Sequence, residues 1–204
     1  SANGFDSKDE FISYLMLNYR RNLALDDYAK SLVTESAINK YYENSVYGDI
    51  NTKYITIEGN DDEAKSLAQR ILNRLSNGQT FEEVVEHYGD QINHEDLGYI
   101  SYDNDLDENY VNALLKLQEN TYTTEAVEVD SNLMIIFRYD QKEKPSIDDV
   151  KENIIETLAD DIKSDDDSLY YKALINLRKE AKLKFEDDSF AKEYNKYVDT
   201  YNTK

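Results

Sequence analysis

The chain has 204 residues, of which 40% are hydrophobic, so it is long and apolar enough to bury a core in one or two domains. Its formal net charge of -20, from 43 acidic against 23 basic residues, predicts a strongly negative surface. This argues against nucleic acid as a partner, because phosphate backbones are bound by Lys and Arg, whereas cationic polypeptides fit. The absence of cysteine excludes disulfides and thiolate chemistry.

The N-terminus offers no membrane or export signal. No stretch approaches the ~20 apolar residues of a membrane helix, and no signal peptide precedes Ser1. Ser1-Ala2-Asn3-Gly4 leads directly into a helical pattern. We therefore expect the chain to be a fragment that lacks upstream sequence.

Residues 1–50 predict two helices. Ser7-Lys8-Asp9-Glu10 has the form of a capping box, and a long amphipathic helix should follow it up to a break at residues 31–33. Thr34 can cap the second helix, which ends near Gly48. The apolar residues of the first helix recur at spacings that place them on one face: Phe11, Ile12, Leu15, Tyr19, Leu23 and Tyr28.

Residues 51–141 change to alternating patterns that predict four strands, at 53–57, 98–101, 122–129 and 133–139. Three helices interrupt them. The first spans 64–75 and is closed by Asn77-Gly78, the second is opened by the box Thr80–Glu83, and the third spans 109–117. This order predicts an α+β domain with a small sheet.

Residues 142–204 predict helices alone. Pro145, the single proline, marks the exit from the last strand, and Ser146 opens a helix that breaks at the acidic run Asp165–Asp167. A helix at 170–181, a short extended piece at 183–185 and a last helix at 189–201 follow. Phe190, Tyr194 and Tyr197 share one face of the last helix.

Several motifs occur in the order and spacing of a known family. Tyr54–Ile57 stands where that family has His-Ile-Leu-Val, and Glu95–Ile100 stands where it has Gly-Asp-Leu-Gly-Phe-Phe. The other matches are the Gly-x-x-Phe pattern within Asn77–Tyr88, the helix Tyr110–Leu117, the closing Met134-Ile135-Ile136, and the helical stretches Ser146–Leu158 and Leu177–Leu183. Residues 53–139 thus resemble a parvulin domain, and the whole chain resembles the PrsA-type foldases of Gram-positive bacteria.

The resemblance implies a fold, a location and partners. A parvulin-like domain of about four strands with helices, at 51–141, would be flanked by an α-helical lobe in which 1–50 packs with 142–204. The protein would be a lipoprotein on the outer face of the cell membrane, held by a lipid anchor absent from this chain. It would bind unfolded or partly folded secreted proteins and need no cofactor.

The resemblance also implies a site, and this chain departs from it. Parvulins use an apolar proline pocket beside two buried histidines and a Cys or Asp. Tyr54 stands at the first histidine position, and Met134, or Leu133 after a shift of one residue, stands at the second. The third position falls on Asp90 or Gln91, and the proline pocket maps onto Leu106 and Tyr110. No side chain at the first two positions can reproduce a neutral imidazole pair, so we expect a largely degenerate catalytic site.

Other residue types predict less. His87 and His94 are expected to be exposed and to bind no metal, because no third ligand is spaced to join them. The 18 tyrosines should mostly be core residues with a hydrated hydroxyl; alternatively, those in 11–42 and 170–201 line a groove for unfolded chains. No glycine loop has the spacing that binds phosphate.

Two functional hypotheses follow. In the first, the chain is a membrane-tethered chaperone whose lobe binds clients and whose parvulin-like module is a scaffold or secondary peptide site. In the second, it is a working prolyl isomerase that relies on Asp90, Tyr54 and the apolar pocket. A helical adaptor without clients is a third possibility, and apolar surface on the first helix makes a homodimer plausible.

Overall fold

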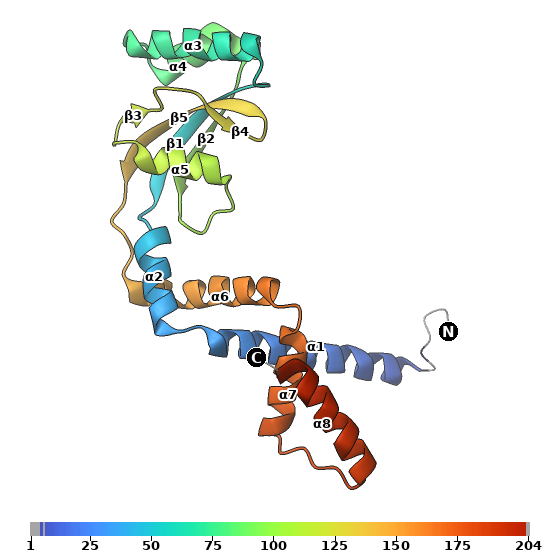
Figure 1. Cartoon of the computed structure of the whole chain (residues 1–204). Helices are drawn as coiled ribbons and strands as arrows, with labels where there is room; N and C mark the ends of the chain where they lie inside the picture. The colour runs from blue at the N-terminus through green and yellow to red at the C-terminus, as the bar shows by residue number, and fades with distance from the viewer. Residues whose placement is uncertain (1–4, 6, 203–204) are drawn as a thin grey trace. The chain divides into compact units, whose positions relative to one another are not determined.

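The computed structural model describes residue 5 and residues 7–202, so the opening Ser1–Gly4 lies outside the described residues. The chain divides into two compact units. A helical unit combines Ser1–Asn44 with Ser146–Lys204, and a sheet unit spans Ser45–Pro145 (Figure 1).

The sheet unit is built on one antiparallel sheet in the order β2-β1-β5-β3, with β4 also paired to β5. The long central strands β1 and β5 pair from Ile50 opposite Gln141 to Ile57 opposite Leu133. The strands are β1 (Ile50–Ile57), β2 (Asn93–Ile100), β3 (Thr121–Tyr122), β4 (Val127–Val129) and β5 (Asn132–Gln141). The predicted α+β class is confirmed.

The helices of this unit begin and end at the signals seen in the sequence. They are α3 (Asp62–Ser76), α4 (Phe81–Tyr88) and α5 (Glu108–Lys116), with a short 3-10 turn at Gly89–Gln91. Thr80 and Glu83 form the predicted reciprocal capping box of α4. Gly78, at φ +92°, takes the left-handed conformation that ends α3.

The sheet separates two hydrophobic layers because side chains alternate along β1. Ile55 and Ile57 pack against α3 and α4, whereas Ile50 and Tyr54 lie on the opposite face with α5. Full burial of one isoleucine contributes about 1.5–3 kcal/mol, so these alternating residues hold both helical layers to the sheet. Figure 1 shows α3 and α4 on one side of the sheet and α5 on the other.

Two strand predictions in this unit are wrong. β2 begins at Asn93, not at Gly98, so His94 lies in a strand and not in a loop. The exposed polar residues at its start give no alternating apolar signal. The predicted strand 122–129 is in fact two short strands, β3 and β4, which leave the sheet between them.

The helical unit consists of α1 (Lys8–Leu32), α2 (Glu35–Ser45), α6 (Ile147–Asp165), α7 (Leu169–Glu180) and α8 (Asp188–Asn202). α1 packs against α6 and α7, and α7 packs against α8. Ala29, Ala159 and Leu169 form a small buried cluster in this unit. Three ion pairs join the helices of this unit, and each adds little because the side chains are partly or largely exposed: Lys30–Glu156 at 3.0 Å, Lys163–Asp26 at 2.8 Å and Lys151–Glu35 at 2.7 Å.

The apolar stripe of α1 is largely exposed in its first half. Phe11, Leu15 and Tyr19 remain 42%, 48% and 65% exposed, and Ala29 is the buried residue of the helix. The packed part of α1 is its second half, around Leu25. Spacing along a helix predicts which residues share a face, but the position of other helices decides whether that face is covered. Within the described residues, no helix is both long and apolar enough to span a membrane.

Candidate functional site

The residues matched to the parvulin site lie on the face of the sheet that α5 covers. Tyr54 stands near the middle of β1, between β2 and β5, and its side chain is half-buried. Its ring meets the ring of Tyr110 edge-on, with centroids 5.7 Å apart. Tyr110 is only 3% exposed because it lies in the first turn of α5, which faces the sheet. The two aromatic rings therefore form the centre of the candidate site.

A hydrogen-bond network holds both phenol groups. Thr52, fully buried, donates its hydroxyl proton to the Phe137 carbonyl at 2.7 Å. The Tyr110 hydroxyl lies 2.8 Å from the same Thr52 oxygen and must be the donor there, because a threonine has a single hydroxyl proton. Tyr54 donates to the carboxylate of Glu95, its cross-strand neighbour on β2, at 2.5 Å. Each phenol proton thus already has an acceptor.

The environment keeps both phenols protonated. Burial raises the pKa of Tyr110 to about 12, against a smaller lowering by its hydrogen bond with Thr52. Burial, followed by the bond to the Glu95 carboxylate, raises the pKa of Tyr54 to about 12. Neither tyrosine can therefore act as a general base near neutral pH.

Met134 and Leu133, the two residues considered for the second histidine position, lie on opposite faces of the sheet. Tyr54 is paired with Ile136, and Met134 follows two residues away on the same face of β5. Met134 packs in the hydrophobic cluster of Tyr54 and Tyr110, whereas Leu133 packs on the opposite face. The thioether of Met134 offers at most a weak hydrogen-bond acceptor there.

Leu106 and Tyr110, the residues expected to line a proline pocket, pack in one hydrophobic cluster. Asp107 caps α5 by accepting from the backbone N–H groups of Asn109 at 2.8 Å and Tyr110 at 3.2 Å. This cap places Leu106 just before the helix, half-buried in the same cluster as Tyr110. The apolar wall is thus present beside a polar network that contains no imidazole.

The third predicted position lies elsewhere. Asp90 is exposed in the short 3-10 turn, where it lines a cavity of about 300 Å³ with Ile57 and Asp61 at the end of β1. Among the described residues, no hydrogen bond or ion pair joins Asp90 to Tyr54 or Met134. Gln91, the alternative, donates to the Tyr88 carbonyl at 3.3 Å.

The two histidines of the chain are both exposed and have separate partners. His87, at the end of α4, lies 2.7 Å from the Arg74 guanidinium. His94, on β2, meets the ring of Phe81 edge-on with centroids 6.0 Å apart. Among the residues that the structure describes, no group of His, Asp and Glu side chains is arranged to hold a metal ion.

Two residues of the network were missed at the level of sequence. The sequence did not indicate Thr52 as a site residue, because threonine is common in β-strands whatever its role. Glu95 did give one, since it replaces the glycine of the family's Gly-Asp-Leu-Gly motif, and that departure marks the carboxylate that now binds Tyr54.

Fold and site together define a small antiparallel-sheet domain with an apolar, helix-covered site, flanked in sequence by helices. The family model described as the PPIC-type PPIASE domain matches residues 36–142, more than half of the chain. The chain belongs to this family of parvulin-type peptidyl-prolyl isomerase domains.

Solved structures of PrsA foldases are similar over nearly the whole chain. The foldase protein PrsA of Streptococcus pneumoniae matches with a TM-score of 0.60 and 19% identity, covering 94% of this chain and 71% of that one. The peptidylprolyl isomerase PrsA of Bacillus cereus matches with a TM-score of 0.55 and 20% identity, covering 96% and 71%. At these identities the similarity shows a shared fold. No curated protein sequence matches the chain.

Proposed function

We propose that this chain is an extracytoplasmic foldase that binds non-native secreted polypeptides, and that its parvulin-like domain has lost most isomerase activity. The proposed loss of activity rests on the sequence motifs, which place Tyr54 and Met134 at the positions of the two family histidines; their location on one face of the sheet supports it.

The physical argument concerns the barrier. Rotation about an Xaa-Pro bond is opposed by ~18–20 kcal/mol of amide resonance, so a catalyst must bind the twisted amide better than either planar form. Tyr54 already donates to Glu95, and Tyr110 already donates to Thr52. To donate a hydrogen bond to a twisted amide, either tyrosine would have to break its existing bond. The site can therefore stabilise the twisted amide only little more than the planar forms.

The location and partners belong to the same proposal. The chain would act at the outer face of the cell membrane as part of a lipoprotein, with a lipid anchor upstream of Ser1, and it would form a homodimer through α1. The similarity to structures named as PrsA foldases supports the location. The net charge of -20 supports clients with cationic segments, and the exposed apolar residues of α1 support the dimer.

An active prolyl isomerase is the second candidate. The apolar wall of Leu106 and Tyr110 favours it, because that wall would still accept a proline ring. In this case Tyr54 would be the polar residue beside the wall, and Asp90, which lies in a separate cavity, could not contribute as the sequence suggested.

Two assays run side by side distinguish these candidates. A protease-coupled assay on Xaa-Pro peptides measures isomerisation, and suppression of aggregation of a chemically denatured client measures chaperone activity. We expect aggregation suppression with weak isomerisation. Isomerisation as fast as in a histidine-containing parvulin, lost in Leu106→Ala but kept in the exposed control Leu115→Ala, would establish the enzyme instead. A response in neither assay would favour a helical adaptor.

A double substitution probes the site itself. Tyr54→His with Met134→His should raise isomerase activity only slightly, because Glu95, Thr52 and Tyr110 still form a network unlike that of the family. A gain to the level of a histidine-containing parvulin would show that the two imidazoles alone were missing.

A further inference from the structure

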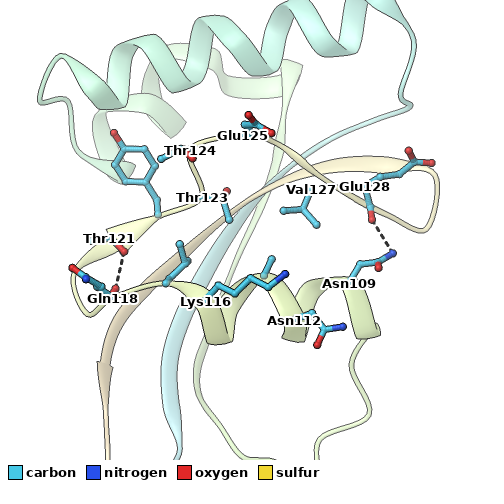
Figure 2. A pocket seen from close by; sticks show the side chains of 13 residues that line it. Asn109, Asn112, Lys116, Gln118, Thr121, Thr123, Thr124, Glu125, Val127 and Glu128 are labelled. Carbon is cyan, nitrogen blue, oxygen red and sulfur yellow. Dashed lines mark hydrogen bonds between the residues drawn. The ribbon is translucent and has the colours of Figure 1, made fainter.

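A second cavity in the sheet unit lies apart from the tyrosine site. It is a cleft of about 920 Å³ between α5 and the segment Thr121–Glu128 (Figure 2). Its helical wall is formed by Asn109, Asn112 and Lys116, which repeat at helical spacing along one face of α5. Tyr110 and Leu114 occupy the neighbouring, buried face of the helix. One face of α5 thus packs in the core, and another face lines the cleft.

The cleft exists because the edge strand is interrupted. After β3, Thr123 still holds to β5: its N–H donates to the Ile136 carbonyl at 2.9 Å, and its hydroxyl accepts from the Ile136 N–H at 3.1 Å. Thr124 and Glu125 are exposed, and pairing resumes only at Val127 of β4. A continuous strand 122–129, which the alternation predicted, would not have this exposed excursion. The departure from the expected pattern coincides with a hollow on the surface, as is common at functional sites.

The lining has the chemistry of a peptide-binding surface. Asn109, Asn112 and Gln118 supply side-chain amides, each with donor and acceptor groups that can pair with peptide N–H and C=O groups. The less exposed part of the lining combines the buried Thr123 with half-buried apolar side chains such as Ala113 and Val127. The volume lies within the range of about 300–1,000 Å³ that is typical of ligand sites.

The charges of the cleft argue for the same class of ligand. Lys116 lies on the helical wall and Glu125 on the opposite wall, and neither takes part in an ion pair among the described residues. Opposite charges on facing walls suit a polypeptide, which carries amides and mixed side chains, better than a phosphate or another strongly charged ligand. The amide and hydroxyl groups of the cleft can pair with the backbone of a bound peptide whatever its side chains are. Binding would therefore depend little on the sequence of the peptide.

We propose that the cleft between α5 and Thr121–Glu128 binds a polypeptide segment in an extended conformation, and that this binding does not require a proline residue. The proposal rests on the proposed function for its ligand class, a non-native polypeptide, but it assigns binding to a surface separate from Tyr54 and Tyr110. A client held there would be retained on the sheet unit without occupying the apolar wall of Leu106.

The test uses the whole chain and a fluorescein-labelled, proline-free decapeptide of Ser, Thr, Gln and Leu. Binding is followed by fluorescence anisotropy, and the site is mapped by amide-resolved NMR spectra. We expect shifts at the side-chain amides of Asn112 and Gln118 and none at Asn195 of α8. Asn112→Trp, which fills the cleft from an exposed position, should weaken binding about tenfold.

Leu115→Trp is the matched control, because Leu115 is exposed on α5 within one turn of Asn112 and does not line the cleft. Its affinity should stay within about twofold of the parent chain. Thr124→Trp, on the opposite wall, gives a second blocking variant that leaves α5 unchanged. Equal binding by Asn112→Trp, Thr124→Trp and the parent chain, or shifts confined to other surfaces, would overturn the proposal.

Peptide binding and aggregation suppression, measured on the same protein, separate this proposal from the proposed function. If aggregation suppression persists while the decapeptide fails to perturb the cleft, the cleft proposal is wrong and the foldase proposal stands. If the decapeptide binds in the cleft but no client is protected from aggregation, the cleft is a peptide site and the foldase proposal is wrong.

Discussion

The sheet unit and the helical unit bury their apolar residues very differently. In the sheet unit, β1 and β5 carry fully buried isoleucines on both faces, and two hydrophobic clusters enclose them. In the helical unit, α1 has Ala29 as its buried residue, and α8 has none among its described side chains. A sheet covered on both faces completes its own core, whereas helices arranged in pairs leave apolar faces open. The sheet unit should therefore carry most of the stability, and the helical unit carries most of the exposed large apolar side chains.

The largest expected effect separates the two units directly. Ile135→Ala removes a fully buried side chain from β5 and should lower the free energy of unfolding by about 2–5 kcal/mol. In dilute, monomeric protein, Leu15→Ala in α1, at 48% exposure, should change it by less than about 0.5 kcal/mol. Urea denaturation followed by far-UV circular dichroism measures both. A comparable loss in the dilute monomer would contradict the exposure of Leu15, whereas a loss that grows with protein concentration would come from the proposed homodimer through α1.

Alkaline pH should weaken the sheet unit through Tyr110. Its pKa is about 12 in the folded state against the ordinary value of 10.0 for a tyrosine, so the unfolded chain loses this proton first as the pH rises. This contribution to stability is complete below pH 10 and is lost between pH 10 and 12, by about 3 kcal/mol for a shift of this size. Urea midpoints measured across this range should fall less in Tyr110→Phe. An unchanged slope would contradict the burial of this phenol.

Loss of the Thr52 hydroxyl should cost about 2 kcal/mol, because Thr52→Val leaves the buried Tyr110 hydroxyl without its acceptor. The matched control is Thr157→Val in α6, where the threonine hydroxyl bonds to a carbonyl on the exposed helix surface. There we expect a change within about 0.5 kcal/mol. The stability changes of both variants are measured from urea denaturation midpoints. Combining Thr52→Val with Tyr110→Phe should recover part of the stability lost in Thr52→Val, because the unpaired hydroxyl is then removed. Additive losses would argue against a direct bond between the two hydroxyls.

The smallest expected changes in stability come from removing helix caps, one in each unit. Thr80→Ala removes the capping box of α4, which is packed on the sheet, and should cost about 1 kcal/mol of global stability. Ser7→Ala removes the bond to the Glu10 N–H at the exposed start of α1, where the helix can fray without unfolding the rest. Hydrogen exchange resolved along the chain should show faster exchange limited to the first turns of α1. Faster exchange throughout the chain in Ser7→Ala would place the start of α1 within the cooperative core.

The sequence by itself determined most of the helices and the identity of the replaced residues. Capping residues such as Thr80 and Ser146, and the glycine at position 78, act within a few residues of themselves, so their effects can be predicted locally. The motif order proposes Tyr54 and Met134 for the two histidine positions, and the structure puts both on one face of the sheet.

The tertiary structure alone decided what depends on pairing between distant segments. The register of β5 against β1 separates Met134 from Leu133, and the pairing of Asn93 with Thr56 makes a strand of residues without apolar alternation. The interruption between β3 and β4, which opens the cleft beside α5, and the exposure of α1 have the same origin. Periodicity records which side chains share a face, but only the neighbouring segments determine whether that face is paired, covered or left open.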